Sequence, residues 1–340
     1  MATMKAWQYT SASGGLVKNL KLNNAAARPP SVLPKDKVLV EVISAALNPA
    51  DYKIPELGLI SRAVIARPAS PGIDYCGKVV VIGSDIDTVK EGDLVFGRLD
   101  MPTQFGTLGQ FIIAPRAGCV PLPTGIDPDH AACIGTAGMT EWECIVPYVK
   151  EGSKIFIHGG SGGTGTFGIQ IAKVLGCHVT TSCSTGNVSL CKSIGADEVI
   201  DYKTTNVSEE LKKKGQVFDL VVDNVGDPND LYIAANTFLK SSGKFNQVGF
   251  QMGLAGIASS ASRMLRPGFL GGGKRPFVIA MVQNEYDGYI QMGKWMQEGK
   301  LKAVIDSTYE YSDAPKAFER LKTGHAKGKV VVHVAKKPEQ

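Results

Sequence analysis

A run of glycines between a predicted strand and a predicted helix carries the strongest chemical signal in the chain. Residues 154–165 read KIFIHGGSGGTG, so Gly160, Gly162 and Gly165 have the spacing G-x-G-x-x-G. In this pattern the first glycine permits a tight turn, the second lets a diphosphate approach the backbone, and the third lets helix and strand pack closely. The free amides and positive dipole end of the helix bind the diphosphate. A merely flexible turn is the alternative reading. We expect cofactor phosphates to contact Gly160, Ser161, Gly162, Gly163, Thr164 and Gly165.

The residues after the next predicted strand indicate which dinucleotide binds. A site for NAD usually places an acid about 20 residues beyond the glycines, where it accepts from the ribose 2′-hydroxyl. Here residues 181–187 read TSCSTGN and contain no acid. Because hydroxyl groups can donate to a 2′-phosphate, Ser184 and Thr185, completed by Tyr202 and Lys203, favour NADPH. Lys203 could equally be an ordinary surface lysine, because no arginine supplies a bidentate clamp.

Alternating strands and helices surround the glycine loop, and they must position it. Such alternation predicts right-handed crossovers and an α/β domain with a doubly wound parallel sheet. We expect an irregular loop over the glycine-rich residues 251–274. The predicted strands are 154–158, 178–182, 198–201, 218–224, 244–248 and 276–281, and the predicted helices are 165–175, 188–194, 207–214 and 230–239.

The first third and the tail of the chain show other patterns. Period-2 alternation with frequent Gly and Pro predicts a β-rich, barrel-like domain at the start. An N-cap at Asp127 and a proline at position 128 predict a helix that continues toward Val146, and we place a domain boundary there. The early strands are 5–9, 37–44, 77–83, 93–97 and 109–114; the tail has helices 286–297 and 314–321 and strands 304–309 and 329–334.

Composition excludes several classes of protein. A length of 340 residues suits two domains, and a net charge of +5 with scattered lysines does not indicate nucleic-acid binding. Seven cysteines without a C-x-x-C pair indicate reduced thiols. No apolar run approaches the roughly 20 residues of a membrane span, and no secretory signal is recognisable. We expect a soluble cytoplasmic protein with a small-molecule partner.

Five segments, spread over almost the whole chain, carry a resemblance to a known family. They are LNPADYK at 47–53, PGIDYCG at 71–77, the glycine loop, GADEVIDYK at 195–203 and GHAKGKV at 324–330. They resemble the zinc-independent quinone oxidoreductase-like branch of the medium-chain dehydrogenase/reductase superfamily. The resemblance implies a GroES-like catalytic domain, residues 1–126 and 283–340, and a Rossmann NADP(H)-binding domain, residues 127–282. It also implies a homodimer, since the family commonly pairs Rossmann sheets edge to edge.

The metal-ligand positions of zinc-dependent members hold other residues here. The first-ligand region reads Asn48-Pro-Ala-Asp51, and the usual G-H-E segment reads Gly72-Ile73-Asp74, so we expect no zinc. Without a Lewis acid the easier reaction is hydride donation to a conjugated acceptor. The resemblance thus implies an NADPH-dependent reductase of quinones or α,β-unsaturated carbonyls such as 2-alkenals. The alternatives are a trans-acting enoyl reductase of a polyketide or fatty-acid pathway, which would admit a carrier-bound chain at 251–274, and an NADPH-binding sensor or structural protein with little turnover.

The resemblance also assigns roles around the nicotinamide. It implies that Asn48 and Thr140 line the pocket, that Lys329 lies near the cofactor, and that the strand ends contribute Asn224, Val248 and Gly249. Asn48 could instead only brace its own loop.

Candidate catalytic residues follow from the same segment of the resemblance: Asn48, Tyr52 and Lys53. Tyr52 or Lys53 would polarise the acceptor oxygen or deliver a proton, which bulk water could also supply. Related enoyl reductases use a tyrosine where this chain has Leu57-Gly-Leu59, a departure that weakens the case for a dedicated acid. We expect Asp74 to be a structural hydrogen-bond acceptor.

Overall fold

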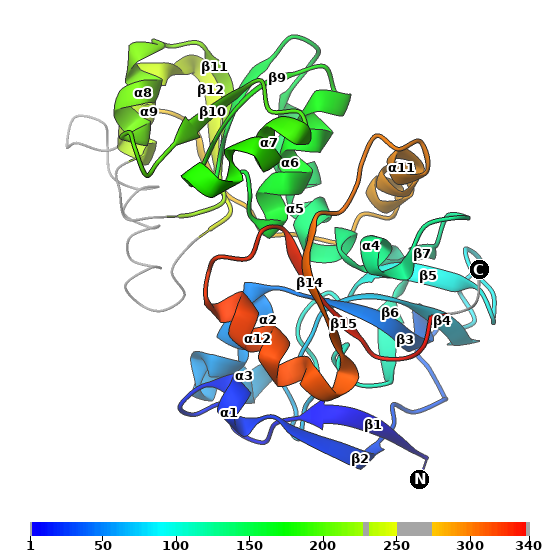
Figure 1. Cartoon of the computed structure of the whole chain (residues 1–340). Helices are drawn as coiled ribbons and strands as arrows, with labels where there is room; N and C mark the ends of the chain where they lie inside the picture. The colour runs from blue at the N-terminus through cyan, green and yellow to red at the C-terminus, as the bar shows by residue number, and fades with distance from the viewer. Residues whose placement is uncertain (1, 227–230, 250–273, 338–340) are drawn as a thin grey trace. The chain divides into compact units, whose positions relative to one another are not determined.

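The computed structural model describes residues 2–226, 231–249 and 274–337. The chain forms two units, one of Met1–Met139 with Gln283–Gln340 and one of Thr140–Val282. In Figure 1 both units can be followed by colour from the N-terminus, in blue, to the C-terminus, in red. The loop predicted at 251–274 lies, apart from Lys274, outside the described residues. Among the described helices we find none with the length and hydrophobicity needed to cross a bilayer.

A six-stranded sheet forms the centre of the unit Thr140–Val282. Neighbouring strands are parallel throughout, in the order β10-β9-β8-β11-β12-β13. The strand order reverses between β8 and β11, and ligands of open α/β sheets bind at such a point. The predicted α/β fold with a parallel sheet is confirmed. The strands are β8 (Lys154–His158), β9 (His178–Cys183), β10 (Glu198–Asp201), β11 (Phe218–Asp223), β12 (Leu239–Gln247) and β13 (Phe277–Ile279).

Short helices join these strands. In α6 most residues are buried, and Phe167, Ile169 and Ile171 have no exposed surface because the helix packs on β8 and β9. The sequence predicted β12 from 244, but it begins at Leu239, whose side chain enters the same apolar cluster as Phe245. The helices are α5 (Met139–Ile145), α6 (Gly163–Val174), α7 (Val188–Ser193), α8 (Val207–Lys213) and α9 (Leu231–Phe238).

The other unit contains a seven-stranded sheet that joins the two ends of the chain. Its order is β14-β15-β3-β4-β5-β7, with β6 paired to β3. Strand β15 from the tail lies antiparallel to β3, so that Val330 pairs with Leu47. The strands are β3 (Lys37–Leu47), β4 (Asp74–Ile82), β5 (Leu94–Arg98), β6 (Phe111–Pro115), β7 (Cys119–Pro121), β14 (Ile305–Glu310) and β15 (Lys329–His333).

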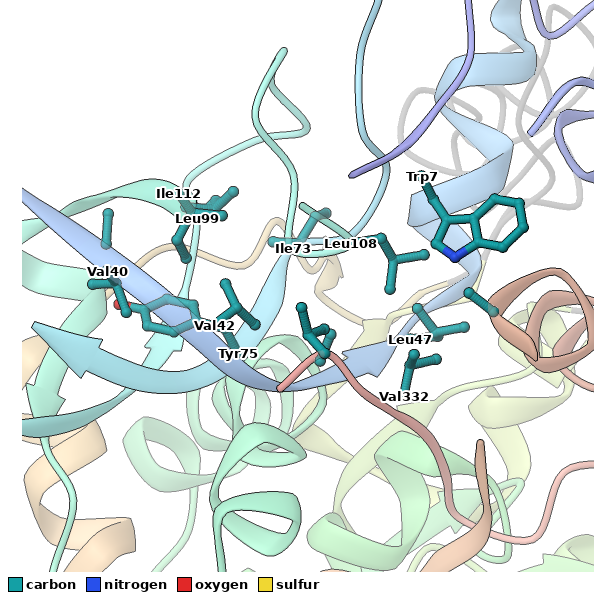
Figure 2. Close-up of a cluster of buried hydrophobic side chains, with 14 of the residues drawn as sticks. Trp7, Val40, Val42, Leu47, Ile73, Tyr75, Leu99, Leu108, Ile112 and Val332 are labelled. Atoms are coloured by element: carbon teal, nitrogen blue, oxygen red, sulfur yellow. The ribbon is translucent and has the colours of Figure 1, made fainter. Parts of the chain in front are cut away.

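One apolar core supports this sheet. Figure 2 shows Leu47 from the first third of the chain beside Val332 from the tail. A separate hairpin pairs β1 (Thr3–Gln8) with β2 (Lys21–Ala27). Strand β2 was not predicted, because it buries one residue of seven and so lacks a clear apolar face. The helices are α1 (Leu16–Asn19), α2 (Pro49–Lys53), α3 (Leu59–Val64), α4 (Pro128–Ala132), α11 (Tyr286–Gln297) and α12 (Ala314–Lys322).

The single helix predicted from Asp127 toward Val146 is interrupted. Helix α4 ends at Ala132, a π-helical turn follows over Ile134–Gly138, and α5 begins at Met139. The turn wraps around the Asp74 carboxylate, which accepts hydrogen bonds from the Thr136 amide at 2.7 Å and the Thr136 hydroxyl at 2.6 Å. Irregular helical turns of this kind are common where side chains are used for function.

Polar contacts place α4 in the β-rich unit. Asp129 accepts from the Ser44 hydroxyl at 2.5 Å, lies 2.9 Å from His333 Nε2, and forms an ion pair with Lys337 at 2.7 Å. Residues 127–139 were predicted to belong to the Rossmann domain. In the structure these residues pack with strands β3, β4 and β15, because Asp129 ties them to both ends of the chain.

All seven cysteines are buried and have free thiols. Burial raises the pKa of Cys119 and of Cys133 to about 12 in each case. A hydrogen bond with Cys191 lowers the pKa of Cys183, which is also buried.

The contact of His333 with Asp129 gives a pH-dependent contribution to stability. Burial opposes the charged imidazolium, but hydrogen bonds with Asp129 and Glu310 outweigh it and raise the pKa of His333. Such a group stabilises the fold fully below its unfolded pKa of about 6.5, and the contribution is lost as pH rises through the folded pKa. We expect His333→Gln to lower unfolding free energy by up to about 1 kcal/mol at about pH 5.5 and by less at about pH 8.5.

Urea denaturation at both pH values measures this effect. His325→Gln, which removes an exposed histidine of the same unit, is the matched control. An equal loss at the two pH values for His333→Gln would contradict the expectation.

Candidate functional site

The glycine loop connects β8 to α6 through three close backbone contacts. Gly159 adopts a positive φ of 80°, and the Gly162 amide donates to its carbonyl at 3.1 Å, which closes a turn with Gly160 as its second residue. A Cβ at Gly160 would lie 2.0 Å from Thr181 Oγ1, and a Cβ at Gly165 would lie 2.3 Å from the Gly159 carbonyl oxygen. Gly160 therefore allows the loop to pack on β9, and Gly165 allows α6 to pack on the loop.

The start of α6 has backbone amide groups that precede the first hydrogen bond of the helix. The first hydrogen bond of the helix runs from the Thr166 amide to the Gly162 carbonyl at 3.0 Å. The preceding amides of Gly163, Thr164 and Gly165 have no acceptor within the helix. A Cβ at Gly162 would meet nothing nearer than the Gly159 carbonyl at 3.4 Å. This arrangement suits a diphosphate, which needs amide donors and a clear approach.

The loops after β9 and β10 lie side by side. Asp201 pairs with Cys183 in the parallel register, and the Tyr202 amide donates to the Cys183 carbonyl at 3.1 Å. Ser184 and Thr185 therefore neighbour Tyr202 and Lys203, as two adjacent strand ends require. The carboxylate of Asp201 accepts from the Lys203 amide at 2.9 Å.

The Lys203 side chain is exposed and lies near an aromatic ring. Its Nζ is 5.6 Å from the centre of the Tyr202 ring, and Tyr202 is itself 46% exposed. Beside them, Asn187 Nδ2 donates to Ser161 Oγ at 3.0 Å and links the segment after β9 to the glycine loop.

The ends of β11 and β12 complete this edge of the sheet. The amides of Val248 and Gly249 donate to the Asp223 carbonyl at 2.9 and 3.1 Å, and the Asn224 amide donates to the His158 carbonyl at 3.3 Å. These contacts draw the three predicted strand-end residues to the edge that carries the glycine loop. Thr140, at the start of the unit, is buried.

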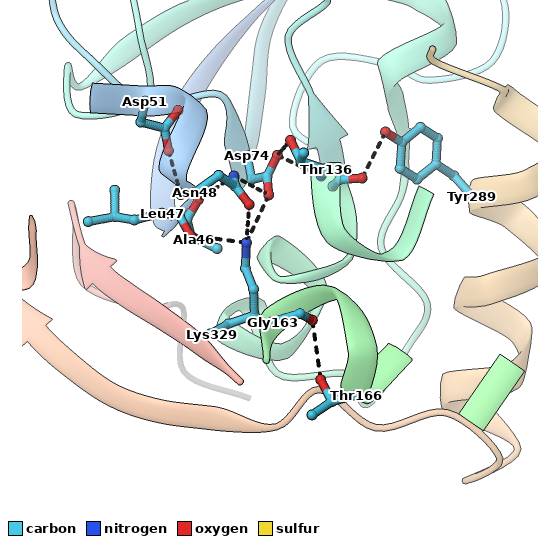
Figure 3. Close-up of polar contacts among 11 residues, drawn as sticks. Ala46, Leu47, Asn48, Asp51, Asp74, Thr136, Gly163, Thr166, Tyr289 and Lys329 are labelled. Carbon is cyan, nitrogen blue, oxygen red and sulfur yellow. Dashed lines mark hydrogen bonds and ion pairs between the residues drawn. The ribbon is translucent and has the colours of Figure 1, made fainter. Parts of the chain in front are cut away.

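In the β-rich unit, a buried polar cluster surrounds Asp74 (Figure 3). Asn48 Nδ2 donates to Asp74 Oδ2 at 2.8 Å, and Lys329 Nζ donates to Asn48 Oδ1. The same ammonium also donates to the Leu47 carbonyl at 3.1 Å and to Asp74 Oδ2 at 3.3 Å. The structure therefore brings together Asn48 and Lys329, which are 281 residues apart in the chain. Asp74 is the hydrogen-bond acceptor that joins them, as expected.

Asp51 and Thr136 belong to this cluster but were not among the predicted site residues. Asp51 Oδ2 accepts from the Asn48 amide at 2.7 Å and closes a capping box at the start of α2. Burial, together with the nearby charge of Asp74, raises the pKa of Asp51 to about 8, so it is neutral at pH 7. The spacing of Asn48 and Asp51 is a capping-box signal that the sequence does contain.

The donor set of the cluster does not suit zinc, the metal of the zinc-dependent members of the superfamily. Zinc prefers thiolate, imidazole and carboxylate ligands. Here the Lys329 ammonium lies between Asn48 and Asp74, so a divalent cation would meet a positive charge. Among the described residues no group of three or more His, Cys, Asp and Glu side chains is arranged to hold a metal ion.

Tyr52 and Lys53 lie on α2, which begins beside the cluster. Both are half-buried, and Tyr52 packs against the apolar core with its ring centre 4.8 Å from Lys322 Nζ. Burial, with a smaller effect of Glu56, raises the pKa of Tyr52, so its hydroxyl keeps its proton at pH 7.

Two glycines of the loop should respond differently to substitution. We expect Gly162→Val to keep the midpoint of urea denaturation near that of the native protein, but to weaken dinucleotide binding at least about tenfold because its side chain enters the open space. We expect Gly165→Val to lower stability by about 1–3 kcal/mol, because it would overlap the Gly159 carbonyl. Calorimetric titration with NADPH and with NADH, together with denaturation, checks both. Equal destabilisation by the two variants would contradict this expectation.

Removal of the Lys329 charge should leave Asp74 as an uncompensated buried charge. We expect Lys329→Met to lower unfolding free energy by about 3–5 kcal/mol, and Asp74→Asn added to it to restore part of the loss. Lys327→Met, at a neighbouring exposed lysine, should change it by less than about 0.5 kcal/mol. Denaturation of the native protein, of Lys329→Met, of Asp74→Asn, of their double variant and of the Lys327→Met control checks this coupling, and a double variant with the summed loss of the two single changes would argue against it.

The chain matches two sequence profiles. Residues 34–124 match the alcohol dehydrogenase GroES-like domain, and residues 194–332 match the family described as zinc-binding dehydrogenase. The quinone oxidoreductase from Coxiella burnetii has a similar solved structure, with a TM-score of 0.83 and 29% identity over 98% of this chain and 100% of that one.

Curated relatives agree with these matches. Trans-enoyl reductase pgmF of Aspergillus terreus is 50% identical over 98% of this chain and 97% of its own length. The chloroplastic NADPH-dependent alkenal/one oxidoreductase of Arabidopsis thaliana is 32% identical over 97% of this chain and 79% of its own length. The predicted family is confirmed: the chain is an oxidoreductase of the medium-chain dehydrogenase/reductase superfamily, in its quinone oxidoreductase-like branch.

Proposed function

We propose that the protein is an NADPH-dependent, zinc-independent reductase of α,β-unsaturated carbonyl compounds, with quinones as further acceptors. The observation that carries the proposal is the glycine loop, where the amides of Gly163, Thr164 and Gly165 precede the first hydrogen bond of α6 and the space beside Gly162 is clear. Members of the family use NAD(P)H. When bound, the reduced nicotinamide supplies the hydride.

We propose that the pocket for the ribose 2′-phosphate is formed by Ser184 and Thr185 with Tyr202 and Lys203. The pairing of β9 with β10 makes the two loops neighbours, and Lys203 is exposed. A carboxylate would repel a phosphate, and the segment 181–187 has none. This arrangement supports NADPH over NADH.

The roles around the nicotinamide are part of the same proposal. Thr140, Asn224, Val248 and Gly249 would contact the nicotinamide half from the Rossmann unit. Asn48 and Lys329 keep the roles that the family resemblance implies, with Asn48 held by Lys329 and Asp74. A rigid amide held in this way can orient a ligand without moving during the reaction.

We propose Tyr52 or Lys53 as the group that polarises the acceptor oxygen or protonates the product. Tyr52 keeps its proton at neutral pH because burial raises its pKa. Water remains the competing proton source.

A second candidate function is that of an enoyl reductase acting in trans on a chain carried by another protein. It is favoured by the 50% identity to a protein named as a trans-enoyl reductase. Both candidates use the same hydride transfer to a carbon–carbon double bond conjugated with a carbonyl, and they differ in whether the acceptor is free or thioester-linked.

Rapid-mixing measurements of NADPH oxidation separate these candidates. We expect turnover with a simple enone and with 9,10-phenanthrenequinone, lower kcat/KM with NADH, and loss of activity in Gly162→Val. A strong preference for an N-acetylcysteamine enoyl thioester would favour the enoyl reductase instead. Tight binding of NADPH without turnover of any acceptor would overturn both and favour a sensor or structural protein.

We also propose a homodimer and a cytoplasmic location. Strand β13 pairs only with β12 among the described strands, so its other edge has no described strand partner and could pair with a second copy. Seven free, buried thiols suit a reducing compartment.

A further inference from the structure

The Rossmann unit contains a buried acid, Glu141, that is not among the expected cofactor contacts. Glu141, on α5, has no exposed surface. Its Oε1 accepts from Asn224 Nδ2 at 2.7 Å, whereas its Oε2 has no hydrogen-bond partner in the described part of the chain. Burial raises the pKa of Glu141 to about 8, and the hydrogen bond from Asn224 opposes this rise. Carboxyl groups are costly to bury, so this one requires a reason.

The surroundings of Glu141 are adapted to it. A Cβ at Gly168 of α6 would lie 2.5 Å from Glu141 Oε2, so only glycine leaves room for the carboxyl group. Glycine within a helix is unfavourable by about 1 kcal/mol relative to alanine. Glu141 on α5 and Gly168 on α6 are thus each unfavourable by themselves. Together they allow a carboxyl group to lie against Asn224.

Glu141 fixes the side chain of Asn224. The amide oxygen of Asn224, Oδ1, makes no hydrogen bond to any described residue. The orientation of this side-chain amide is therefore fixed by the hydrogen bond to Glu141. Asn224 is the first residue of the turn after β11. In that turn the amides of Val225 and Gly226 donate to Asp223 Oδ1 at 3.1 and 3.0 Å.

This turn lies on the nicotinamide side of the glycine loop. In a Rossmann sheet the strand after the first helix, here β9, approaches the adenosine ribose. Strand β11 flanks β8 on the opposite side. The turn also touches the loop itself, because a Cβ at Gly159 would lie 2.9 Å from Val225 Cγ2 and 3.8 Å from Asn224 Cβ. The Asn224 carbonyl oxygen also approaches Gly249, because a Cβ at Gly249 would lie 2.5 Å from it.

We propose that Glu141 is a positioning residue: through Asn224 it holds the turn Asn224–Gly226 in the form that binds the nicotinamide half of NADPH. The inference rests on the proposed function, since it requires NADPH as the ligand. Glu141 does not touch the cofactor; it acts through the single hydrogen bond to Asn224. Its loss would leave the half-buried Asn224 amide without this side-chain partner, and the turn would relax.

Binding of a whole cofactor and of its adenosine half tests the proposal. We expect Glu141→Leu to weaken NADPH binding about tenfold in calorimetry, a change equal to about 1.4 kcal/mol. The same variant should bind adenosine 2′,5′-bisphosphate within about twofold of the native protein. Glu141→Gln retains an oxygen acceptor for Asn224, so we expect it to restore NADPH binding to within about threefold of native.

Asn224→Ala removes the other side of the hydrogen bond between Glu141 and Asn224. It is the variant to measure if Glu141→Leu folds poorly. It should reproduce the selective loss of NADPH binding, and the two changes together should cost no more than one of them, as expected for groups that act as a unit. Native-like NADPH binding by Glu141→Leu, or equal weakening of both ligands, would overturn the proposal. Failure of the unaltered protein to bind NADPH would instead overturn the proposed function.

Discussion

The β-rich unit depends on one buried carboxylate. Asp74 has no exposed surface, and it accepts hydrogen bonds from Asn48, Lys329 and, twice, from Thr136. Asn48 lies at the start of α2, Lys329 lies on β15, and Thr136 lies in the π-helical turn before α5. A charge in a protein interior is tolerated when it is paired and hydrogen-bonded, and removing one partner is costly. The carboxylate thus fixes three distant segments to one another, and Asn48 becomes rigid as a result.

The polar groups of this cluster are paired with one another. Lys329 Nζ forms an ion pair with Asp74 Oδ2 at 3.3 Å, and burial together with Asp74 raises the pKa of Asp51 to about 8. In this chain an ammonium group thus lies among the side chains at the positions that hold zinc ligands in zinc-dependent members of the superfamily. The chemistry that remains favourable is one in which the developing negative charge is delocalised on the acceptor, as in hydride addition to an enone.

Local patterns were enough to predict the Rossmann unit. Strands 154–158 and 198–201 were predicted to the residue, because the turn residues and helix signals beside them are adjacent in sequence. The helix from 127 to 146 was predicted as continuous because its interruption depends on Asp74, a distant residue. For the same reason no local signal indicates the contact of Lys329 with Asn48, although the family resemblance had placed both near the cofactor. Glu141 was missed because an acid in a short helix that also carries Glu143 looks like an exposed residue until the burial of its neighbours is known.

The burial of every cysteine bears on the chemical hazard of the proposed acceptors. Enones and quinones are soft electrophiles that alkylate accessible thiolates, and a thiolate, rather than a thiol, is the nucleophile. The thiols of this chain are shielded, and burial raises the pKa of Cys119 and Cys133 to about 12 in each case, so these two are almost wholly protonated. Shielding and protonation of this kind limit conjugate addition of the acceptor to the side chains of Cys119 and Cys133.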